Sequence, residues 1–417
     1  MERVGVSGLV SLACVKCRQE LPKTTRLLRC PRCQGLLDPQ YDYDLVGSTL
    51  TWEVVGRRPR SIWRWRELLP IEDGRCIVSL GEGDTPLVPS IRVGPALGIN
   101  LSLMNDGMNP TGSLKDRSMA VVTSKAVERG YRVIACDSSG NKAASLSAYA
   151  ARAGLVSLVF CPNTTPSQKL LQIIAYGGRL VIVDTDRDGV ARLYSELMQR
   201  RHTEWYDSGV SNPFRYEGKK TYAYEIAEAF AGRAPDWILH PAAGSMSIVK
   251  NWKGFGELES LGLVHDKPHL VAVQPHNCAP IVAAYQNESR TVSPVEHRPT
   301  MAGGLSMPNP GDLGDLTLQV IRESGGAAVA VTEEEIRWGM QALWEEGIFS
   351  EPTGAVTIPA LRRLVEQGTI HSGDTVVCIV TGTGFKDLHR LAEMVSVPPP
   401  IPATRSALEE ASQRLLE

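Results

Sequence analysis

One lysine of the chain, Lys115, stands in a stretch that is unusual for a lysine exposed to water. Residues 109–119 read NPTGSLKDRSM, so a proline, a glycine and two hydroxyl residues precede the amine. A solvated lysine gains nothing from such a stiff, turn-forming approach, whereas a lysine that must present its amine at a fixed point does. Lys115 is therefore the candidate for covalent chemistry, and a plain surface lysine is the alternative.

Three glycine-bearing turns occur where we expect strands to end: DSSGNKAAS at 137–145, PAAGSMS at 241–247 and TGTGFKD at 381–387. The first two each precede an expected helix, and the free N–H groups of a helix N-terminus favour an anion. One turn could bind a carboxylate and the other a phosphate, although each alone is also ordinary turn chemistry. Together with a presented lysine, they predict a site for an amino acid and pyridoxal phosphate, the phosphorylated aldehyde that forms a Schiff base with lysine.

Four of the nine cysteines have the spacing of a metal site. Cys14, Cys17, Cys30 and Cys33 form C-x2-C, twelve residues and a second C-x2-C, so two short turns can offer thiolate pairs to one tetrahedral Zn²⁺. Four thiolates leave no open coordination position, which predicts a structural zinc; a pair of disulfides is the alternative. The other five cysteines are scattered singly in apolar surroundings, as in a reducing compartment: Cys76, Cys136, Cys161, Cys278 and Cys378.

Length and composition predict an ordinary soluble protein of two or three domains. The 417 residues are 43% hydrophobic and 22% charged, and no run of eighteen apolar residues occurs. The N-terminus lacks a clear signal-peptide cleavage pattern, so we expect a cytoplasmic protein without membrane contact. The 44 basic and 46 acidic side chains give a net charge of −2 without a long basic block, and we expect no nucleic-acid partner.

Alternating strands and helices must position these groups. Apolar runs without polar alternation, which predict parallel strands buried on both faces, occur at 132–138, 155–162, 179–185, 236–243, 269–275 and 375–382. Helical patterns lie between them at 139–154, 165–178, 186–201, 219–232 and 333–347. The sequence therefore predicts an α/β protein with two sheets.

The domain boundaries follow from changes in pattern. We expect a zinc-ribbon module at 1–45 and, at 46–104, a connecting arm whose Trp residues pack against the start of a large domain. A small α/β domain at 105–205 would carry Lys115 and the first turn, and a large α/β domain at 206–395 the second turn. The proline run VPPPIP would tether a C-terminal tail at 396–417.

The motif around Lys115 is similar to the pyridoxal-lysine motif of the threonine synthases. It lies in a colinear set of segments that also resembles that family: LGEGDTPLV, SSGNKAASLSAYAARAG, NPFRYEGKKTYAYEI, NWKGFGEL, EPTGA and TGTGFKD. The ribbon followed by YDYD, and the WRWRELLP arm, are similar to the longer threonine synthases, so the resemblance covers nearly the whole chain. It implies a fold type II, tryptophan-synthase-β-like enzyme with two parallel-sheet α/β domains and an N-terminal four-cysteine zinc ribbon.

The resemblance also implies roles at the cofactor. Lys115 would form the Schiff base and shuttle protons between the α, β and γ carbons of the substrate. The other implied cofactor contacts are Asn141 to the phenolic O3′, Thr381 to the pyridine nitrogen, and Gly244, Ser245, Met246 and Ser247 to the phosphate. A neutral hydroxyl at Thr381 leaves that nitrogen largely unprotonated and weakens the ring as an electron sink. For Asn141, a helix cap is the alternative.

For the substrate, the resemblance implies a carboxylate site in the turn formed by Ser138, Ser139 and Gly140, through backbone N–H groups. Lys142 stands beside this turn, because the chain reads SGNK where the family usually reads SGNT. A lysine there would add a mobile positive charge next to the substrate. A salt bridge with Asp137 is the alternative.

A second cation, Arg215, is kept from the family pattern and is a natural partner for a substrate phosphate. Two cations at one small site favour a substrate with a second anionic group, although Asp207 or Glu217 could instead pair with Arg215. Other departures from the family are Ser118 in KDRS for KDRG, Met246 in AGSMS for a GNxGN loop, Thr383 in TGTG for TGHG, and DSGVSNPFR before Arg215.

The reaction that the resemblance implies converts O-phosphohomoserine and water to threonine and phosphate, in a homodimer that acts on a small, phosphorylated amino acid. Two alternatives keep the cofactor: β-replacement on O-phosphoserine or a related activated amino acid, as in cysteate or cysteine synthases, and dehydration of serine or threonine. A third alternative is a catalytically silent relative, in which the ribbon is a binding module and Lys115 is structural.

Overall fold

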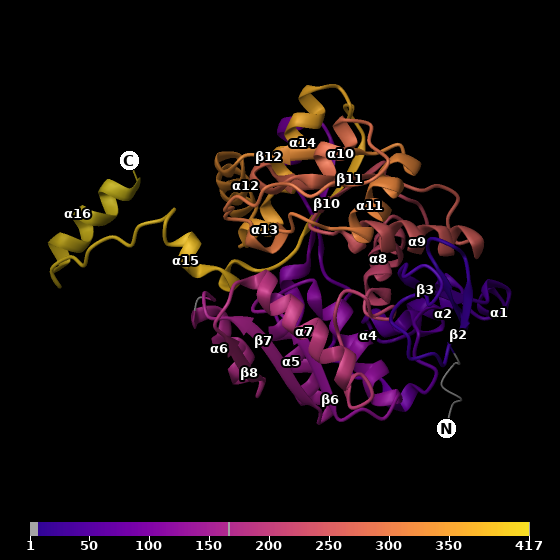
Figure 1. The fold of residues 1–417 in the computed structure, drawn as a ribbon. Helices are drawn as coiled ribbons and strands as arrows, with labels where there is room; N and C mark the ends of the chain where they lie inside the picture. The colour runs from indigo at the N-terminus through magenta and orange to yellow at the C-terminus, as the bar shows by residue number, and fades with distance from the viewer. Residues whose placement is uncertain (1–6, 166, 417) are drawn as a thin grey trace. The chain divides into compact units, whose positions relative to one another are not determined.

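The computed structural model describes residues 7–165 and 167–416 (Figure 1). Residues 7–165 and 167–386 form one compact unit, and a second unit begins at Asp387, ahead of the expected tail at 396–417. The first six residues of the expected ribbon module, Pro166 and Glu417 lie outside the described residues. No helix in the described part of the chain has the length and apolar character needed to cross a membrane.

The first unit contains all strands described for the chain. They are β1 (Leu9–Cys14), β2 (Glu20–Pro22), β3 (Leu37–Tyr41), β4 (Leu87–Pro89), β5 (Asn100–Asn105), β6 (Val133–Asp137), β7 (Val156–Pro162), β8 (Arg179–Val183), β9 (Trp205–Asp207), β10 (Trp237–Pro241), β11 (His269–Pro275), β12 (Ala327–Val331) and β13 (Thr375–Val380). They form a three-stranded, a four-stranded and a six-stranded sheet.

The α-helices of the first unit are α1 (Tyr43–Gly47), α2 (Trp52–Gly56), α3 (Val93–Leu97), α4 (Lys115–Glu128), α5 (Asn141–Ala153), α6 (Ser167–Ala175), α7 (Arg187–Arg201), α8 (Thr221–Ala229), α9 (Met246–Ser260), α10 (Pro280–Gln286), α11 (Asp312–Glu323), α12 (Glu333–Glu345), α13 (Pro352–Ala355) and α14 (Thr357–Glu366). The second unit contains α15 (Leu388–Leu391) and α16 (Arg405–Leu416).

The four-stranded sheet has the order β8-β7-β6-β9, and all of its strands are parallel. Its central strand β6 is covered on both faces, because successive side chains of a strand point to opposite sides. Ile134 and Cys136 pack in the core formed with α4 and α5, while Ala135 packs against Tyr194 and Met198 of α7. This two-sided burial explains the continuous apolar pattern of the strand.

The six-stranded sheet has the order β12-β11-β10-β13-β5-β4, with only the edge strand β4 antiparallel. The helices α10 and α11 contact β11 and β12, whereas α14 contacts β10, β12 and β13. Figure 1 shows the helices α10 to α14 in orange tones around this sheet. The expectation of an α/β structure with two largely parallel sheets is confirmed.

The arm that joins the ribbon to the sheets is anchored by tryptophans, as its composition predicts. The ring of Trp65 is fully buried and lies 4.8 Å from the ring of Tyr224 and 5.6 Å from that of Trp52, measured between centroids. The indole N–H of Trp63 donates to Glu82 Oε1 over 2.6 Å. Trp65 and Trp52 hold the arm against α8, while the bond from Trp63 to Glu82 joins two parts of the arm itself.

The chain passes between the two parallel sheets twice, and both passages carry candidate residues. One passage leads from β5 in the six-stranded sheet to α4, which begins at Lys115. The other leads from β9 in the four-stranded sheet to α8 and includes Arg215. The turns after β6, β10 and β13 also lie at carboxyl ends of parallel strands, where α/β folds bind their ligands.

Candidate active site

The loop before Lys115 is bonded to the segment that follows β13, which accounts for its unusual sequence. Leu114 N donates to Thr381 O over 2.8 Å, and Thr383 N donates to Gly112 O over 3.0 Å. Gly112 has a φ of +83°, and a Cβ atom there would lie 2.8 Å from Thr383 Cγ2. A glycine is needed for this conformation and this close approach. The loop therefore fixes Lys115 at the first position of α4.

Asp116 joins the same loop to α5. Its carboxylate accepts hydrogen bonds from Thr111 N at 2.7 Å, Thr111 Oγ1 at 2.6 Å and Ser145 Oγ at 2.5 Å. Burial raises the pKa of Asp116 to about 6. The hydroxyl residue Thr111 thus serves to hold the lysine loop, and the bond from Ser145 aligns α4 with α5.

Arg117 fixes α4 from the other side. Its guanidinium is completely buried, pairs with Asp106 at 3.0 Å and Glu225 at 2.5 Å, and lies 4.4 Å from the ring centroid of Tyr222. Because these partners come from the end of β5 and from α8, Arg117 connects the lysine helix to both elements. The two residues that follow Lys115 thus carry buried charges with several partners each, and they hold the start of α4 in place.

The amine of Lys115 is poised for chemistry near neutral pH. Burial, together with the positive charges of Arg215 and Lys142, lowers its pKa from 10.5 to about 8, although the carboxylates of Glu351 and Asp106 oppose this shift. A lysine with such a pKa exists partly as the neutral amine, which is the nucleophilic and proton-accepting form.

Glu351 lies at the centre of this site, although the sequence analysis assigned it no role. Its carboxylate accepts hydrogen bonds from Asn141 Nδ2 at 3.0 Å and from Thr381 Oγ1 at 3.1 Å. Burial raises the pKa of Glu351, and the charge of Lys115 opposes that rise. Glu351 opens the EPTGA segment, so the resemblance pointed to the segment but not to this contact.

The turn of Ser138, Ser139 and Gly140 lies at the N-terminus of α5. Gly140 is the N-cap residue and makes no side-chain capping bond, so the helix N-terminus offers backbone N–H groups at a half-buried turn. Asn141 is the first residue of α5 rather than its cap. Lys142 Nζ lies 2.8 Å from Asp137 Oδ1, which is the salt bridge considered as an alternative in the sequence.

The loop after β10 leads into α9 through an unusual conformation. Ser245 has a φ of +56°, in the left-handed region, and its buried Oγ has no hydrogen-bond partner among the described residues. A Cβ atom on Gly244 would lie 2.9 Å from Leu313 Cδ1, so a larger residue there would have to displace the Leu313 side chain. Met246 packs against Leu36 and Leu313. A strained residue with an unused buried hydroxyl at a helix N-terminus fits an anion site.

Two buried cations face this region. Arg215 is 8% exposed, stacks over the Tyr216 ring at 4.7 Å, and its Nε and Nη1 have no hydrogen-bond partner in residues 7–165 and 167–416. Asp207 instead accepts from Tyr194 at 2.6 Å. The second cation is Lys219, which no sequence motif indicated and whose amine donates to Ser247 in the first turn of α9.

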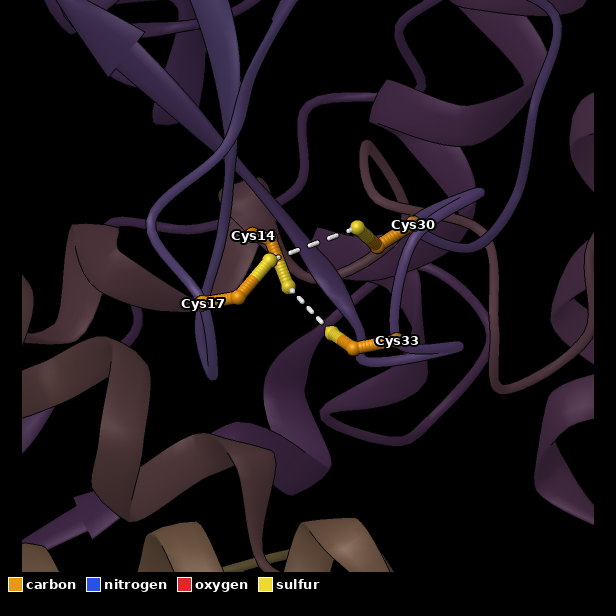
Figure 2. A group of neighbouring side chains, drawn as sticks. All are labelled: Cys14, Cys17, Cys30 and Cys33. Carbon is orange, nitrogen blue, oxygen red and sulfur yellow. Dashed lines mark hydrogen bonds between the residues drawn. The ribbon is translucent and has the colours of Figure 1, made fainter.

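The four cysteines of the ribbon converge, as Figure 2 shows. Their sulfur atoms all lie within 4.8 Å of one another, and Gly35 allows this approach because a Cβ there would lie 2.9 Å from Cys14 Sγ. Zn–S bonds of about 2.3 Å in a tetrahedron require sulfur atoms roughly 3.8 Å apart. The closest pairs are separated by 3.4 and 3.6 Å and are free thiols, not disulfides.

Comparisons with known proteins agree with this site. The family model described as pyridoxal-phosphate dependent enzyme matches residues 78–382. Threonine synthase from Methanocaldococcus jannaschii is 37% identical over 377 residues, covering 90% of this chain and 92% of that protein. Threonine synthase from Methanosarcina acetivorans is 35% identical over 403 residues, covering 96% of this chain and 98% of that protein.

Solved structures share the fold at lower identity. Threonine deaminase isoform 2 from Solanum lycopersicum aligns with a TM-score of 0.62 and 20% identity over 75% of this chain and 88% of that one. Maize serine racemase aligns with a TM-score of 0.63 and 19% identity over 80% of this chain and 94% of that one.

Fold and lysine site together define a pyridoxal-phosphate dependent enzyme of fold type II. Within that class, the chain belongs to the threonine synthase family.

The residues present fit the cofactor. Lys115 offers an amine of lowered pKa, and the unpartnered hydroxyl of Ser245 lies at the N-terminus of α9, where a phosphate would find donors. Asn141 and Thr381 are oriented by one carboxylate, that of Glu351. Sequence motifs indicated the residues near Lys115 and in the glycine turns. No motif indicated Glu351 beyond its place in EPTGA.

Proposed function

We propose that this enzyme converts O-phosphohomoserine and water to threonine and phosphate. The observation that carries the substrate assignment is Arg215, a buried guanidinium with two nitrogens that lack partners in the described structure. A buried charge without a counter-ion is costly, so its retention favours a ligand with an anionic group at that position. The relatives named as threonine synthases support the same reaction type.

When bound, pyridoxal phosphate supplies an electron sink that makes the C–H bonds near the substrate nitrogen acidic. Lys115 Nζ is the group that we propose moves the protons at the α, β and γ carbons. Its lowered pKa allows it to accept a proton near neutral pH and to return it. The bonds that fix Asp116 and Arg117 keep this amine at one place while the protons move.

Substrate orientation would come from two ends of the site. We propose that the N–H groups at Ser138, Ser139 and Gly140 bind the α-carboxylate at the start of α5. Arg215 would bind the γ-phosphate through two N–H groups at once, which a planar guanidinium does better than an amine. Lys142, held by Asp137, would support the carboxylate turn and add positive charge beside it.

Glu351 would act as a positioning residue. Its carboxylate accepts hydrogen bonds from the amide of Asn141 and from the hydroxyl of Thr381. We propose that Asn141 then meets the phenolic oxygen of the cofactor and that Thr381 faces its pyridine nitrogen. A neutral hydroxyl there would leave the nitrogen largely unprotonated.

A substrate panel tests the proposed reaction directly. Purified enzyme is offered O-phosphohomoserine, O-phosphoserine, the corresponding O-acetyl amino acids, serine and threonine, while phosphate, ammonia and keto acids are measured and products are identified by mass. We expect threonine and phosphate from O-phosphohomoserine. Formation of cysteine or cysteate from O-phosphoserine with an added sulfur nucleophile, or keto acid from serine, would replace this function with the corresponding alternative.

We also propose one structural Zn²⁺ per chain, bound by Cys14, Cys17, Cys30 and Cys33. The closed four-sulfur geometry supports it, because such a site has no open position for substrate. Metal analysis of enzyme purified without chelators should give one zinc per chain, and its removal should lower stability more than kcat. Absence of zinc, or disulfides between these cysteines, would contradict the proposal.

The family resemblance further supports a homodimer located in the cytoplasm. Single buried thiols such as Cys136 and Cys378 suit a reducing compartment. Light scattering of the purified enzyme at several concentrations would test the homodimer, which should give twice the 45.4 kDa mass of the chain.

A further inference from the structure

Lys219 is a buried lysine without a carboxylate partner in the part of the chain that the structure describes. It lies in the short 3-10 helix η4 (Glu217–Lys220), and its side chain is 7% exposed. Its Nζ donates one hydrogen bond, to Ser247 Oγ at 2.8 Å. Ser247 is the second residue of α9, so the amine of Lys219 lies at the N-terminus of that helix.

The neighbouring Lys220 provides an internal comparison. It is also fully buried, but its Nζ lies 2.9 Å from Glu217 and 2.9 Å from Glu257, and 3.8 Å from the ring centroid of Tyr41. Two carboxylates thus pair with Lys220, while among the described residues none lies within ion-pair distance of Lys219 and only Asp106 acts on its charge from farther away. The two lysines are adjacent and both buried, so burial does not explain why only Lys220 has carboxylate partners.

The surroundings of Lys219 call for an anion. Burial lowers its pKa, and the positive charges of Lys115 and Arg215 lower it further. Ser245, at the entry to α9, leaves its buried hydroxyl without a partner among the described residues. The amine of Lys219 bonds to Ser247, two residues after Ser245, so an ammonium group and an unused hydroxyl both lie at the N-terminus of α9. These are the donor types of a phosphate site.

We propose that Lys219 binds the phosphate of pyridoxal phosphate, together with Ser245, Ser247 and the N-terminus of α9. The loop itself offers no charged side chain, since Met246 packs in an apolar cluster with Leu36 and Leu313. The ammonium group of Lys219 would supply the positive charge. The proposal rests on the cofactor phosphate lying at the loop of Gly244 to Ser247, and not on the identity of the amino-acid substrate.

The test compares two forms of the cofactor that differ only in the phosphate. Full-length enzyme freed of cofactor is titrated with pyridoxal phosphate and with pyridoxal, and binding is followed by absorbance and tryptophan fluorescence. Replacement of a charged hydrogen-bond donor should weaken pyridoxal phosphate binding by about 10- to 100-fold in Lys219→Met. The affinity for pyridoxal should change much less, so the ratio of the two affinities falls.

Three further variants separate the charge of Lys219 from its packing and from general loss of stability. Lys219→Gln retains a donor toward Ser247 without the charge, so it should also lower the ratio and is less disruptive if Lys219→Met folds poorly. Lys220→Met is the matched control: it leaves a buried pair incomplete, so it should lower the melting temperature without changing the ratio. Lys219→Arg should recover part of the ratio because it restores the charge.

An unchanged affinity ratio in folded Lys219→Met and Lys219→Gln would overturn the proposal. If KM for O-phosphohomoserine rose in the same variants, Lys219 would instead be assigned to the substrate phosphate beside Arg215. Failure of the enzyme to make threonine would reject the proposed reaction but would leave the affinity ratio, and hence this proposal, intact.

Discussion

Two clusters of charged side chains meet at η4, and they differ in how many of their charges form ion pairs. The first is a closed network between the ribbon, η4 and α9, made of three carboxylates and three ammonium groups: Asp38, Glu217, Glu257, Lys220, Lys250 and Lys253. Its formal charges sum to zero. Tyr41 and Tyr224 complete it by donating to the carboxylates.

The second cluster is open. Lys115, Arg215 and Lys219 influence one another through their positive charges, and Glu351 is the carboxylate that acts most strongly on Lys115. Arg215 and Lys219 make no ion pair within the described residues. The excess of positive charge is what we expect of a site that binds a phosphorylated cofactor and, as proposed, a phosphorylated substrate. A closed network therefore marks structure, and an open one marks a ligand site.

The largest expected effect is at Lys115. Lys115→Ala should remove turnover, because proton transfer by a positioned side chain alone contributes about 100- to 10,000-fold. It should also remove the visible absorbance of the bound cofactor, since no second lysine lies in a comparable loop. Lys267→Ala, on the surface beside Trp252, is the control and should keep both properties. Turnover and absorbance that survive in Lys115→Ala would show that the site assignment is wrong.

Breaking the closed network should act on stability. Glu217 has its pKa held well below the usual range by Lys220 and Lys250, despite a burial that raises it. Glu217→Ala should lower the free energy of unfolding by about 3 to 5 kcal/mol, because it leaves buried ammonium groups uncompensated. Urea unfolding measures this loss, and it should exceed the loss in Arg215→Ala. Equal losses in the two variants would remove the distinction between the clusters.

Breaking the open cluster should act on binding instead. Arg215→Ala should raise KM for O-phosphohomoserine at least about tenfold, since loss of a charged contact to a buried phosphate weakens binding by about 2 to 5 kcal/mol. O-acetylhomoserine, which lacks the phosphate, serves as the matched substrate and should be affected less. An equal effect on both substrates would show that Arg215 is structural and would favour an unphosphorylated substrate.

The sequence predicted those features of the site that depend on residues close together in the chain. Lys115, the four cysteines and the turns after β6 and β10 were predictable because each depends on residues close together in the chain. The parallel strands were predictable for the same reason, since buried strands read as continuous apolar runs. Lys219 and Lys220 were not separable, because adjacent identical residues give one local pattern while their partners lie in α9.

Long-range contacts were the part that local patterns could not supply. Glu351 meets Asn141 across 210 positions of sequence, and no periodicity connects an EPTGA turn with an SGNK turn. The place of β13 between β10 and β5 is likewise a property of the assembled sheet. The loop before Lys115 shows both kinds of information. Its sequence predicted a rigid loop, but the hydrogen bonds that hold it to Thr381 and Thr383 are visible only in the structure.

The smallest expected effect is a pH dependence that reports the open cluster. Because the pKa of Lys115 is about 8 in the folded enzyme, the fraction of neutral amine should rise roughly fivefold between pH 7 and pH 8. The rate of cofactor uptake by cofactor-free enzyme should rise with it and level off above pH 9. Arg215→Met removes one of the charges that lower this pKa, so it should move the midpoint to higher pH. Stability gives an independent check with its own sign. Between pH 8 and the ordinary lysine value of 10.5, the unfolded chain binds more protons than the folded one, so the free energy of unfolding of cofactor-free enzyme should rise with pH. Lys115→Ala should show a smaller rise, because other buried lysines with lowered pKa values, such as Lys219, still contribute to it. An uptake rate that is flat from pH 7 to 9 would mean that the Lys115 amine is not the group that limits cofactor binding.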